Sequence, residues 1–229
     1  MNEGFGPQKV FEIFGMPITN TVTVTWLIMV VIIGVSYLAT RNLKKRASGA
    51  QVVTELIVTT INDLTEQTMG KKLKAFSPYI GTLLIFIGIA NIAGLFGVRP
   101  PTADVNTTIS LAIVTFLMIH FFGIKYNGLS YLKGFAEPFI LLLPLNIMGE
   151  LATPISLGFR LFGNIVGGMI IMNLLYGALA SFTPALIGIP FLQAGIPVVF
   201  HIYFDLFSGV LQSFIFAMLT MVFISIAVD

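Results

Sequence analysis

The sequence contains no cysteine, which excludes disulfide bonds, zinc–thiolate sites and thiol nucleophiles but does not decide the cellular compartment. Charged residues are also scarce: they make up 10% of the 229 residues, whereas soluble domains carry about 25%. Because 56% of the residues are hydrophobic, we predict a polytopic membrane protein and not a large soluble core.

Signatures of several other protein classes are missing as well. The first apolar run is too long for a cleavable signal peptide, and both acidic and basic residues precede it. There is no P-loop, G-x-S-x-G motif, dinucleotide fingerprint or H-E-x-x-H motif. Basic residues lie beside apolar runs and do not alternate with exposed aromatics, which argues against nucleic-acid binding. We therefore expect no cofactor, no resident metal ion and no nucleic-acid partner.

Five apolar runs are long enough to cross a bilayer, which takes about 20 residues per helix. We predict an all-α polytopic membrane protein that forms a single integral membrane domain over residues 1–229, with a loosely structured terminus before the first span. Prolines and glycines from Pro184 to Pro197 mark a turn between the last two runs. The predicted spans are 21–40, 78–97, 107–124, 139–182 and 196–228, with a proline-rich loop over 98–106.

Residues 50–69 are amphipathic and too polar to span. We predict one amphipathic helix lying on the membrane surface; a helix of a soluble bundle is the weaker alternative because no soluble domain surrounds it. Its apolar face comprises Val53, Leu56, Ile57, Ile61 and Leu64, and its polar face Glu55, Asn62, Asp63 and Glu66.

Lysines and arginines gather on one side of this arrangement, which the positive-inside rule makes cytoplasmic. The N-terminus is then predicted outside and the C-terminus inside. The cytoplasmic set comprises Arg41, Lys44, Lys45, Arg46, Lys71, Lys72, Lys74, Lys125 and Lys133, against Lys9 and Arg99 on the other side.

The last two apolar runs are too long to stand upright in a bilayer. A helix over residues 155–182 would be about 42 Å long, against a hydrocarbon core of about 30 Å. We therefore predict a long, strongly tilted or kinked antiparallel hairpin, which keeps a long flank at mid-membrane depth.

Arg160 stands alone in this hairpin, with no other Lys, Arg, Asp or Glu between Leu151 and Phe204. An arginine at mid-membrane depth is costly and permanently protonated. Its helical neighbours are small or polar, so we predict that it faces a protein partner or a wet cavity; a snorkelling or internally paired arginine is the alternative. The neighbours are Gly149, Thr153, Ser156, Asn164 and Gly167, with Ile171 as the apolar exception.

Polar residues also recur at helical spacing in the final run. Carboxyl groups in apolar surroundings can exchange a proton near neutral pH, so we predict an ion relay at Asp205; a fixed ion pair with Arg160 is the alternative. His201 is either a second relay residue or structural, and two ligands alone make a weak metal site. This polar face comprises His201, Asp205, Ser208, Gly209 and Gln212.

The amides of Asn164 and Gln212 cannot usefully exchange protons, but they can bind Arg160 or line a wet path. Glu150 lies ten residues before Arg160. It is predicted either to line a path on the cytoplasmic side or to face lipid headgroups.

Three segments resemble subunit a of the F-type ATP synthase: SLGFRLFGN (156–164), PTADVNTT (101–108) and LQSFIFAMLTMVFIS (211–225). The resemblance runs from the first span to the end, and its arginine motif is highly specific. It implies a non-catalytic stator subunit of a rotary motor in a bacterial plasma membrane, whose tilted hairpin lies against a carboxylate-bearing ring of c subunits. Protons or sodium ions would reach the ring through an outer half-channel and leave through an inner one, driving ring rotation and ATP synthesis. The implied partners are the c-ring, the b subunits of the peripheral stalk and membrane lipid.

By this resemblance Arg160 is the essential arginine between the half-channels. Ser156, Asn164 and Gln212 correspond to polar positions near it, and Asn91 to a position in the wall of the outer half-channel. A fixed cation favours a deprotonated carboxylate opposite it and repels other cations, which prevents a short circuit between the half-channels.

The sequence departs from the family at Met169, nine residues after Arg160, where many members carry Glu or His. The corresponding partner position on the last helix, often His or Glu, is Asp205. The outer relay is then expected to rest on Asp205, alone or with His201.

Two other functions fit the sequence less well. A secondary ion-coupled transporter would show repeated halves with matched broken helices, and the sequence shows neither. An intramembrane aspartyl protease would need a second aspartate facing Asp205, but Asp63, Asp104 and Asp229 lie outside the predicted spans.

Overall fold

The computed structural model describes residues 6–13, 15–46, 49–137, 139–186 and 191–228. Within these ranges, five helical segments are long and apolar enough to cross a membrane. The prediction of an all-α polytopic membrane protein with five spans is therefore confirmed. The segments are Asn20–Thr40, Lys71–Phe96, Val105–Asn127, Ile140–Ser181 and Gly195–Val228.

The N-terminus is not the loosely structured segment that we predicted. Strands β1 (Lys9–Ile13) and β2 (Met16–Thr19) pair antiparallel, and Gly15 between them has a φ of 78°, a conformation that favours glycine. Because glycine and proline surround the strands, the sequence pattern does not indicate this short hairpin. The Arg99 guanidinium donates to the carbonyl of Gly6, which joins the hairpin to the loop after the second span.

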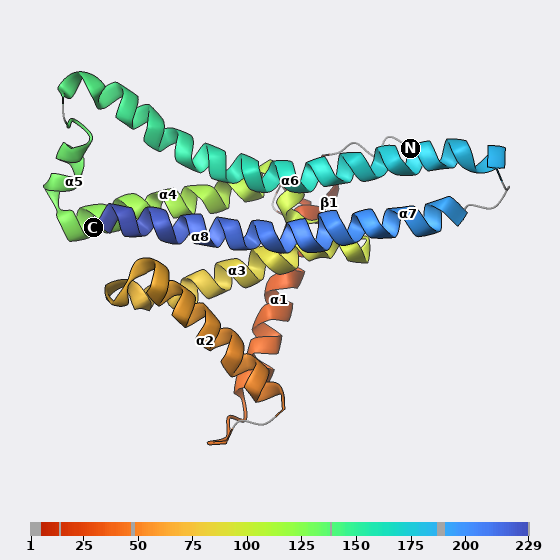
Figure 1. Ribbon diagram of the computed structural model, residues 1–229, viewed down its shortest axis with the longest axis horizontal. Coiled ribbons are helices and arrows are strands. Elements are labelled where there is room, and N and C mark those ends of the chain that lie inside the picture. The colour runs from red at the N-terminus through yellow and green to blue at the C-terminus, as the bar shows by residue number, and fades with distance from the viewer. Residues whose placement is uncertain (1–5, 14, 47–48, 138, 187–190, 229) are drawn as a thin grey trace.

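Helices α1 (Asn20–Thr40) and α2 (Ala50–Met69) form an arm at the side of the molecule. Figure 1 shows α1 leaving the long helices at a steep angle, and few of its residues are buried. The N-terminal half of α2 exposes Val53, Leu56 and Ile57, whereas Thr65 and Met69 near its C-terminal end are buried. The arm therefore presents apolar surface that nothing in the described chain covers.

Two spans form the central packing layer. The second consists of η1 (Lys71–Phe76), α3 (Ser77–Ile92) and η2 (Ala93–Phe96). The predicted loop contains a helical turn, η3 (Pro101–Ala103), and α4 (Val105–Asn127) extends beyond its predicted range at both ends because Asp104 caps it and Gly128 ends it. The short α5 (Leu129–Gly134) follows. A buried core of Ile80, Ile87, Leu161, Phe216 and Met221 joins these helices to the two long ones.

The two long helical runs lie side by side and antiparallel along the longest dimension of the molecule (Figure 1). The short η4 (Ile140–Leu142) leads into α6 (Leu143–Leu186). The 44 residues of α6 correspond to about 66 Å of helix, far more than a bilayer core of about 30 Å. The return run consists of α7 (Phe191–His201), the π-helix η5 (Ile202–Ser208) and α8 (Gly209–Val228).

The return run differs from our prediction in two ways. Gly195 and Pro197 lie inside α7, so helix begins earlier than predicted, as membrane-type helices tolerate proline; Gly188 and Pro190 lie outside the described residues. The run is also not one regular α-helix, because η5 inserts a π-helical segment. Such segments change which side chains share a face, and they often occur at functional sites.

Candidate functional site

Arg160 lies near the middle of α6 and is exposed. Its guanidinium makes no hydrogen bond or ion pair with any residue in the described parts of the chain. The alternative of an internally paired arginine is therefore not what the structure shows. Among the described residues, nothing neutralises this charge.

A small cavity of about 200 Å³ extends from Arg160 along the predicted small-residue stripe. Gly149, Thr153 and Ser156 of α6 line it, and Leu219 and Phe223 of α8 form the opposite wall. The polar stripe thus faces a gap between the two long helices.

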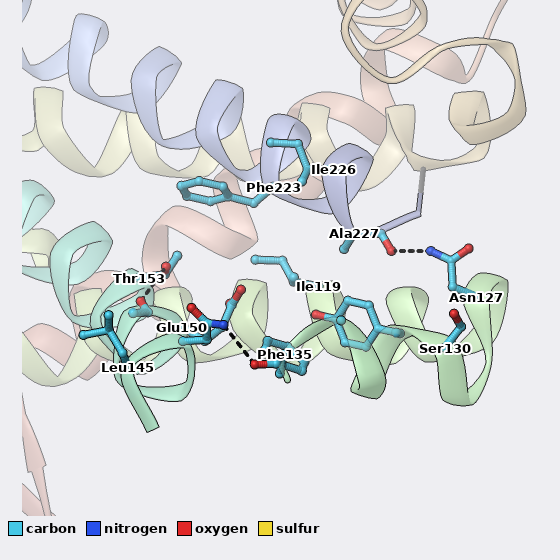
Figure 2. A pocket seen from close by; sticks show the side chains of 14 residues that line it. Ile119, Asn127, Ser130, Phe135, Leu145, Glu150, Thr153, Phe223, Ile226 and Ala227 are labelled. Carbon is cyan, nitrogen blue, oxygen red and sulfur yellow. Dashed lines mark hydrogen bonds between the residues drawn. The ribbon is translucent and has the colours of Figure 1, made fainter. Parts of the chain in front are cut away.

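A larger cavity of about 890 Å³ continues from this gap (Figure 2). It lies toward the end of the molecule where Figure 1 shows α5 beside the end of α8. The two cavities share Gly149, Thr153 and Phe223. Figure 2 shows Glu150 and Thr153 of α6 across from Phe223 of α8. Since α5 carries Lys133, this is the side that the charge distribution predicts to be cytoplasmic. We call this larger space the inner cavity.

Glu150 is one of several polar residues that line the inner cavity. Tyr131 lines it too, and its hydroxyl lies 2.8 Å from Nδ1 of His120. Burial and the neighbouring Glu150 carboxylate raise the pKa of Tyr131, so this hydroxyl stays protonated and can donate. The remaining polar lining residues are Asn127, Ser130, Asn146 and Thr153.

A separate cavity of about 280 Å³ lies near the opposite ends of the long helices, and we call it the outer cavity. It shares no lining residue with the cavity at Arg160. Asp205 and His201 line one side, and Arg99 with the loop after η2 closes another. The wall contributed by α6 comprises Met169, Met172, Asn173 and Tyr176.

Asp205 pairs with His201 and not with Arg160. His201 Nδ1 lies 2.5 Å from Asp205 Oδ2, and His201 Nε2 lies 3.2 Å from the hydroxyl of Tyr176. Tyr176 and Arg160 are separated by about 24 Å of helix. The alternative of a fixed ion pair between Arg160 and Asp205 is therefore wrong.

Asn164 lies between the two cavities and fixes the register of the long helices. Ser208 Oγ donates to Asn164 Oδ1 at 2.8 Å, and Asn164 Nδ2 donates to the Ser208 carbonyl at 3.4 Å. Arg160 lies one turn before Asn164 on α6, and Gln212 lies one turn after Ser208 on the return run. Because the two runs are antiparallel, Arg160 and Gln212 lie at the same level. Gln212 is buried, and its Nε2 has no partner among the described residues.

Asn91 lines none of the described cavities. It is 1% exposed, its Nδ2 donates to the Gly209 carbonyl at 2.8 Å, and its Oδ1 accepts from Thr102 at 2.6 Å. Its carboxamide therefore joins α3, η3 and the end of the π-helix. A Cβ on Gly209 would lie 3.0 Å from the Asn91 Cβ, which shows how closely these elements pack.

No second aspartate meets Asp205 in the described cavities. Asp104 caps α4 through Asn106, and Asp63 lies on α2. Asp229 lies outside the described residues. The arrangement that an aspartyl protease needs is not formed by the aspartates that the structure describes.

The sequence pattern around Arg160 does not point to Tyr176, because Tyr176 lies on another face of α6 than the small-residue stripe. A signal was nevertheless present: Met169, Asn173 and Tyr176 recur at helical spacing and all line the outer cavity. Tyr131 was missed because it lies in a segment that the sequence presents only as a polar connection.

Comparison with known proteins gives one consistent result. The family model described as ATP synthase A chain matches residues 22–225. The chain is 38% identical to the sodium-ion-specific ATP synthase subunit a of Propionigenium modestum, over 96% of this chain and 78% of that protein. It is 40% identical to ATP synthase subunit a of Trichlorobacter lovleyi, over 90% of this chain and 85% of that protein. Identity to the subunit a of Moorella thermoacetica is 34%, over 96% and 95% of the two chains.

Proposed function

Since the chain belongs to the ATP synthase subunit a family, the non-catalytic integral membrane component that translocates ions in that complex, we propose that its inner and outer cavities are the two half-channels of the ion path. Arg160 is the fixed charge between them. Ion flow from one cavity to the other then requires a carrier that passes Arg160, and the carrier we propose is a carboxylate on a ring of c subunits.

One observation carries this proposal: an exposed arginine without a partner in the described chain lies between two polar cavities that share no lining residue. A guanidinium at mid-membrane depth is stable only beside an anion, a polar group or water. A ring carboxylate supplies the anion, and the orphan amide of Gln212 supplies a polar group at the same level. Ser156 and Asn164 extend this polar strip on either side.

The two cavities differ in the groups that exchange ions with water. Asp205 and His201 line the outer cavity, and Glu150 lines the inner one. Carboxyl groups in such surroundings can take up and release protons. We propose that ions enter at Asp205 from outside the cell, pass to the ring, and leave beside Glu150 into the cytoplasm, with the N-terminus outside and the C-terminus inside a bacterial plasma membrane. Asn91 anchors the π-helix that contains Asp205 through its hydrogen bond to the Gly209 carbonyl, and it does not carry ions.

The exposed apolar surface of α1 and α2 fits the remaining partners. Leu27, Val30 and Ile33 of α1 and Leu56 of α2 are each at least 60% exposed, which suits lipid and the membrane helices of the b subunits. Membership of this family argues against the alternative of a secondary ion-coupled transporter. No feature of the described residues favours such a transporter.

The absence of cysteine makes a direct test possible, because any introduced thiol is the only one in the chain. Thr153→Cys in the inner cavity is expected to react with a membrane-impermeant thiol reagent added from the cytoplasmic side alone. Asn173→Cys in the outer cavity is expected to react from the opposite side alone. Labelling of the assembled complex in sided membrane vesicles, followed by mass spectrometry, measures both.

Neighbouring positions provide matched controls for this labelling. Leu151→Cys and Leu174→Cys lie on the same helix at exposed positions that line neither cavity, so lipid should protect them from the reagent. Reaction of both cavity cysteines from the same side would contradict the proposal of two separate half-channels.

A further inference from the structure

The outer cavity contains a hydrogen-bonded chain of three side chains. Tyr176 on α6 contacts His201 Nε2 at 3.2 Å, and His201 Nδ1 contacts Asp205 Oδ2 at 2.5 Å. Both imidazole nitrogens are therefore engaged, which fixes the orientation of the ring. The chain crosses from the C-terminal half of α6 to the π-helix η5.

Exposure decreases along this chain. Tyr176 is 38% exposed as a residue, whereas the side chains of His201 and Asp205 are 33% and 18% exposed. The Asp205 carboxylate packs against η2, where its Cγ and Oδ1 lie 3.5 Å from the place of a Cβ on Gly94. Water in the cavity therefore reaches Tyr176 and His201 more readily than it reaches Asp205.

We propose that His201 carries protons from the outer cavity to Asp205, that Tyr176 positions His201 for this transfer, and that the ion taken up here is a proton. This inference rests on the proposed function and assigns residues and cargo to its outer half-channel. It also accounts for Met169: the second exchanging group lies on α7, as His201, and not on α6.

The proton transfer balances without any further reactant. With Asp205 ionised, neutral His201 donates its Nδ1 proton to Oδ2 and accepts the Tyr176 hydroxyl at Nε2. A proton from cavity water binds Nε2, whose new N–H donates to the Tyr176 oxygen, and the Nδ1 proton moves to Oδ2. One proton has entered and one has reached Asp205. After Asp205 releases it toward the ring, proton exchange with water returns His201 to its first tautomer.

The composition of the cavity wall favours a proton over a sodium ion. A dehydrated cation needs several oxygen ligands in place of its water shell. One Asp205 oxygen is taken by Nδ1, the Tyr176 hydroxyl contacts Nε2, and Met169 and Met172 contribute no oxygen, which leaves Asp205 Oδ1 and the Asn173 carboxamide oxygen among the described lining side chains. Among the described residues, Arg99 is the other charged group that lines this cavity. It donates to the Ala103 carbonyl at 3.3 Å, stays cationic at every accessible pH and so adds no titration of its own.

The test is proton uptake by the reconstituted ATP synthase complex in sodium-free liposomes, measured over a range of outer pH. His201→Gln, which cannot carry a proton, is expected to lower uptake by about 10-fold or more. Tyr176→Phe is expected to lower it by about 3- to 10-fold and to shift the pH profile, because the ring loses one fixing hydrogen bond. Tyr203→Phe is the matched control on η5: its hydroxyl makes no hydrogen bond to a described residue, and wild-type uptake is expected.

Chemical rescue separates proton transfer from a structural role. The space vacated in His201→Ala should admit imidazole added on the outer side, and uptake is expected to recover at least in part. The inference is overturned if Tyr176→Phe and His201→Gln match Tyr203→Phe at every pH, if imidazole rescues nothing, or if uptake by the wild type requires sodium. Those results leave the proposed function standing, which fails instead if Thr153→Cys and Asn173→Cys are labelled from one side.

Discussion

Arg160→Ala is expected to lower ion-driven ATP synthesis by at least about 100-fold while the complex still assembles. The attraction between two unit charges about 4 Å apart is about 4 kcal/mol at an effective dielectric constant of about 20, which corresponds to about 1000-fold in an equilibrium. Without the cation, a ring carboxylate no longer releases its ion at the correct position. Synthesis in membrane vesicles and the amount of complex on native gels measure the two effects.

Assembly is expected to survive because Arg160 contributes no hydrogen bond or ion pair to the described fold. Ser156→Ala lines the same cavity, removes a polar group without changing charge, and is expected to keep synthesis within about 3-fold of wild type. Arg160→Lys is expected to fall between them, because its ammonium group can lose its proton in apolar surroundings. Normal synthesis by Arg160→Ala would contradict the role of the charge.

Asp205→Asn is expected to lower ion uptake by about 100-fold, because an amide keeps the size of the side chain and still accepts a hydrogen bond from His201 but cannot carry a proton. Asp205→Glu, which keeps the carboxyl group, is expected to recover part of the rate. Passive proton uptake by the reconstituted complex measures both variants. An unchanged rate in Asp205→Asn would remove Asp205 from the ion path, and loss of assembly would show a structural role for the pair with His201.

The charges at the centre of the site could be predicted from sequence because they break an otherwise apolar pattern. Arg160 and Asp205 stand out because placing a charged side chain at membrane depth has a large unfavourable free energy. The small-residue stripe beside Arg160 could also be predicted, since a helix has a fixed period, and Gly149, Thr153 and Ser156 do line one gap.

Features that depend on packing between distant segments could not be predicted in this way. Asn91 is polar and lies in a span, yet its two bonds to Gly209 and Thr102 hold it in the core, and nothing in its neighbourhood in the sequence shows these partners. Tyr176 contacts His201 only because the antiparallel hairpin brings the two residues together. The π-helix changes the faces of the last run, so spacing alone does not say which residues meet.

The central claim is that a permanent charge prevents ions from passing directly between the two cavities. The ion leak measured while ring rotation is blocked tests this claim most directly. Liposomes containing the ATP synthase complex, with its catalytic part blocked by a non-hydrolysable nucleotide, are given a membrane potential, and ion flux is measured. We predict no flux through wild type or Ser156→Ala and a clear leak through Arg160→Ala. An Arg160→Ala complex that is assembled and as tight as wild type would contradict the claim.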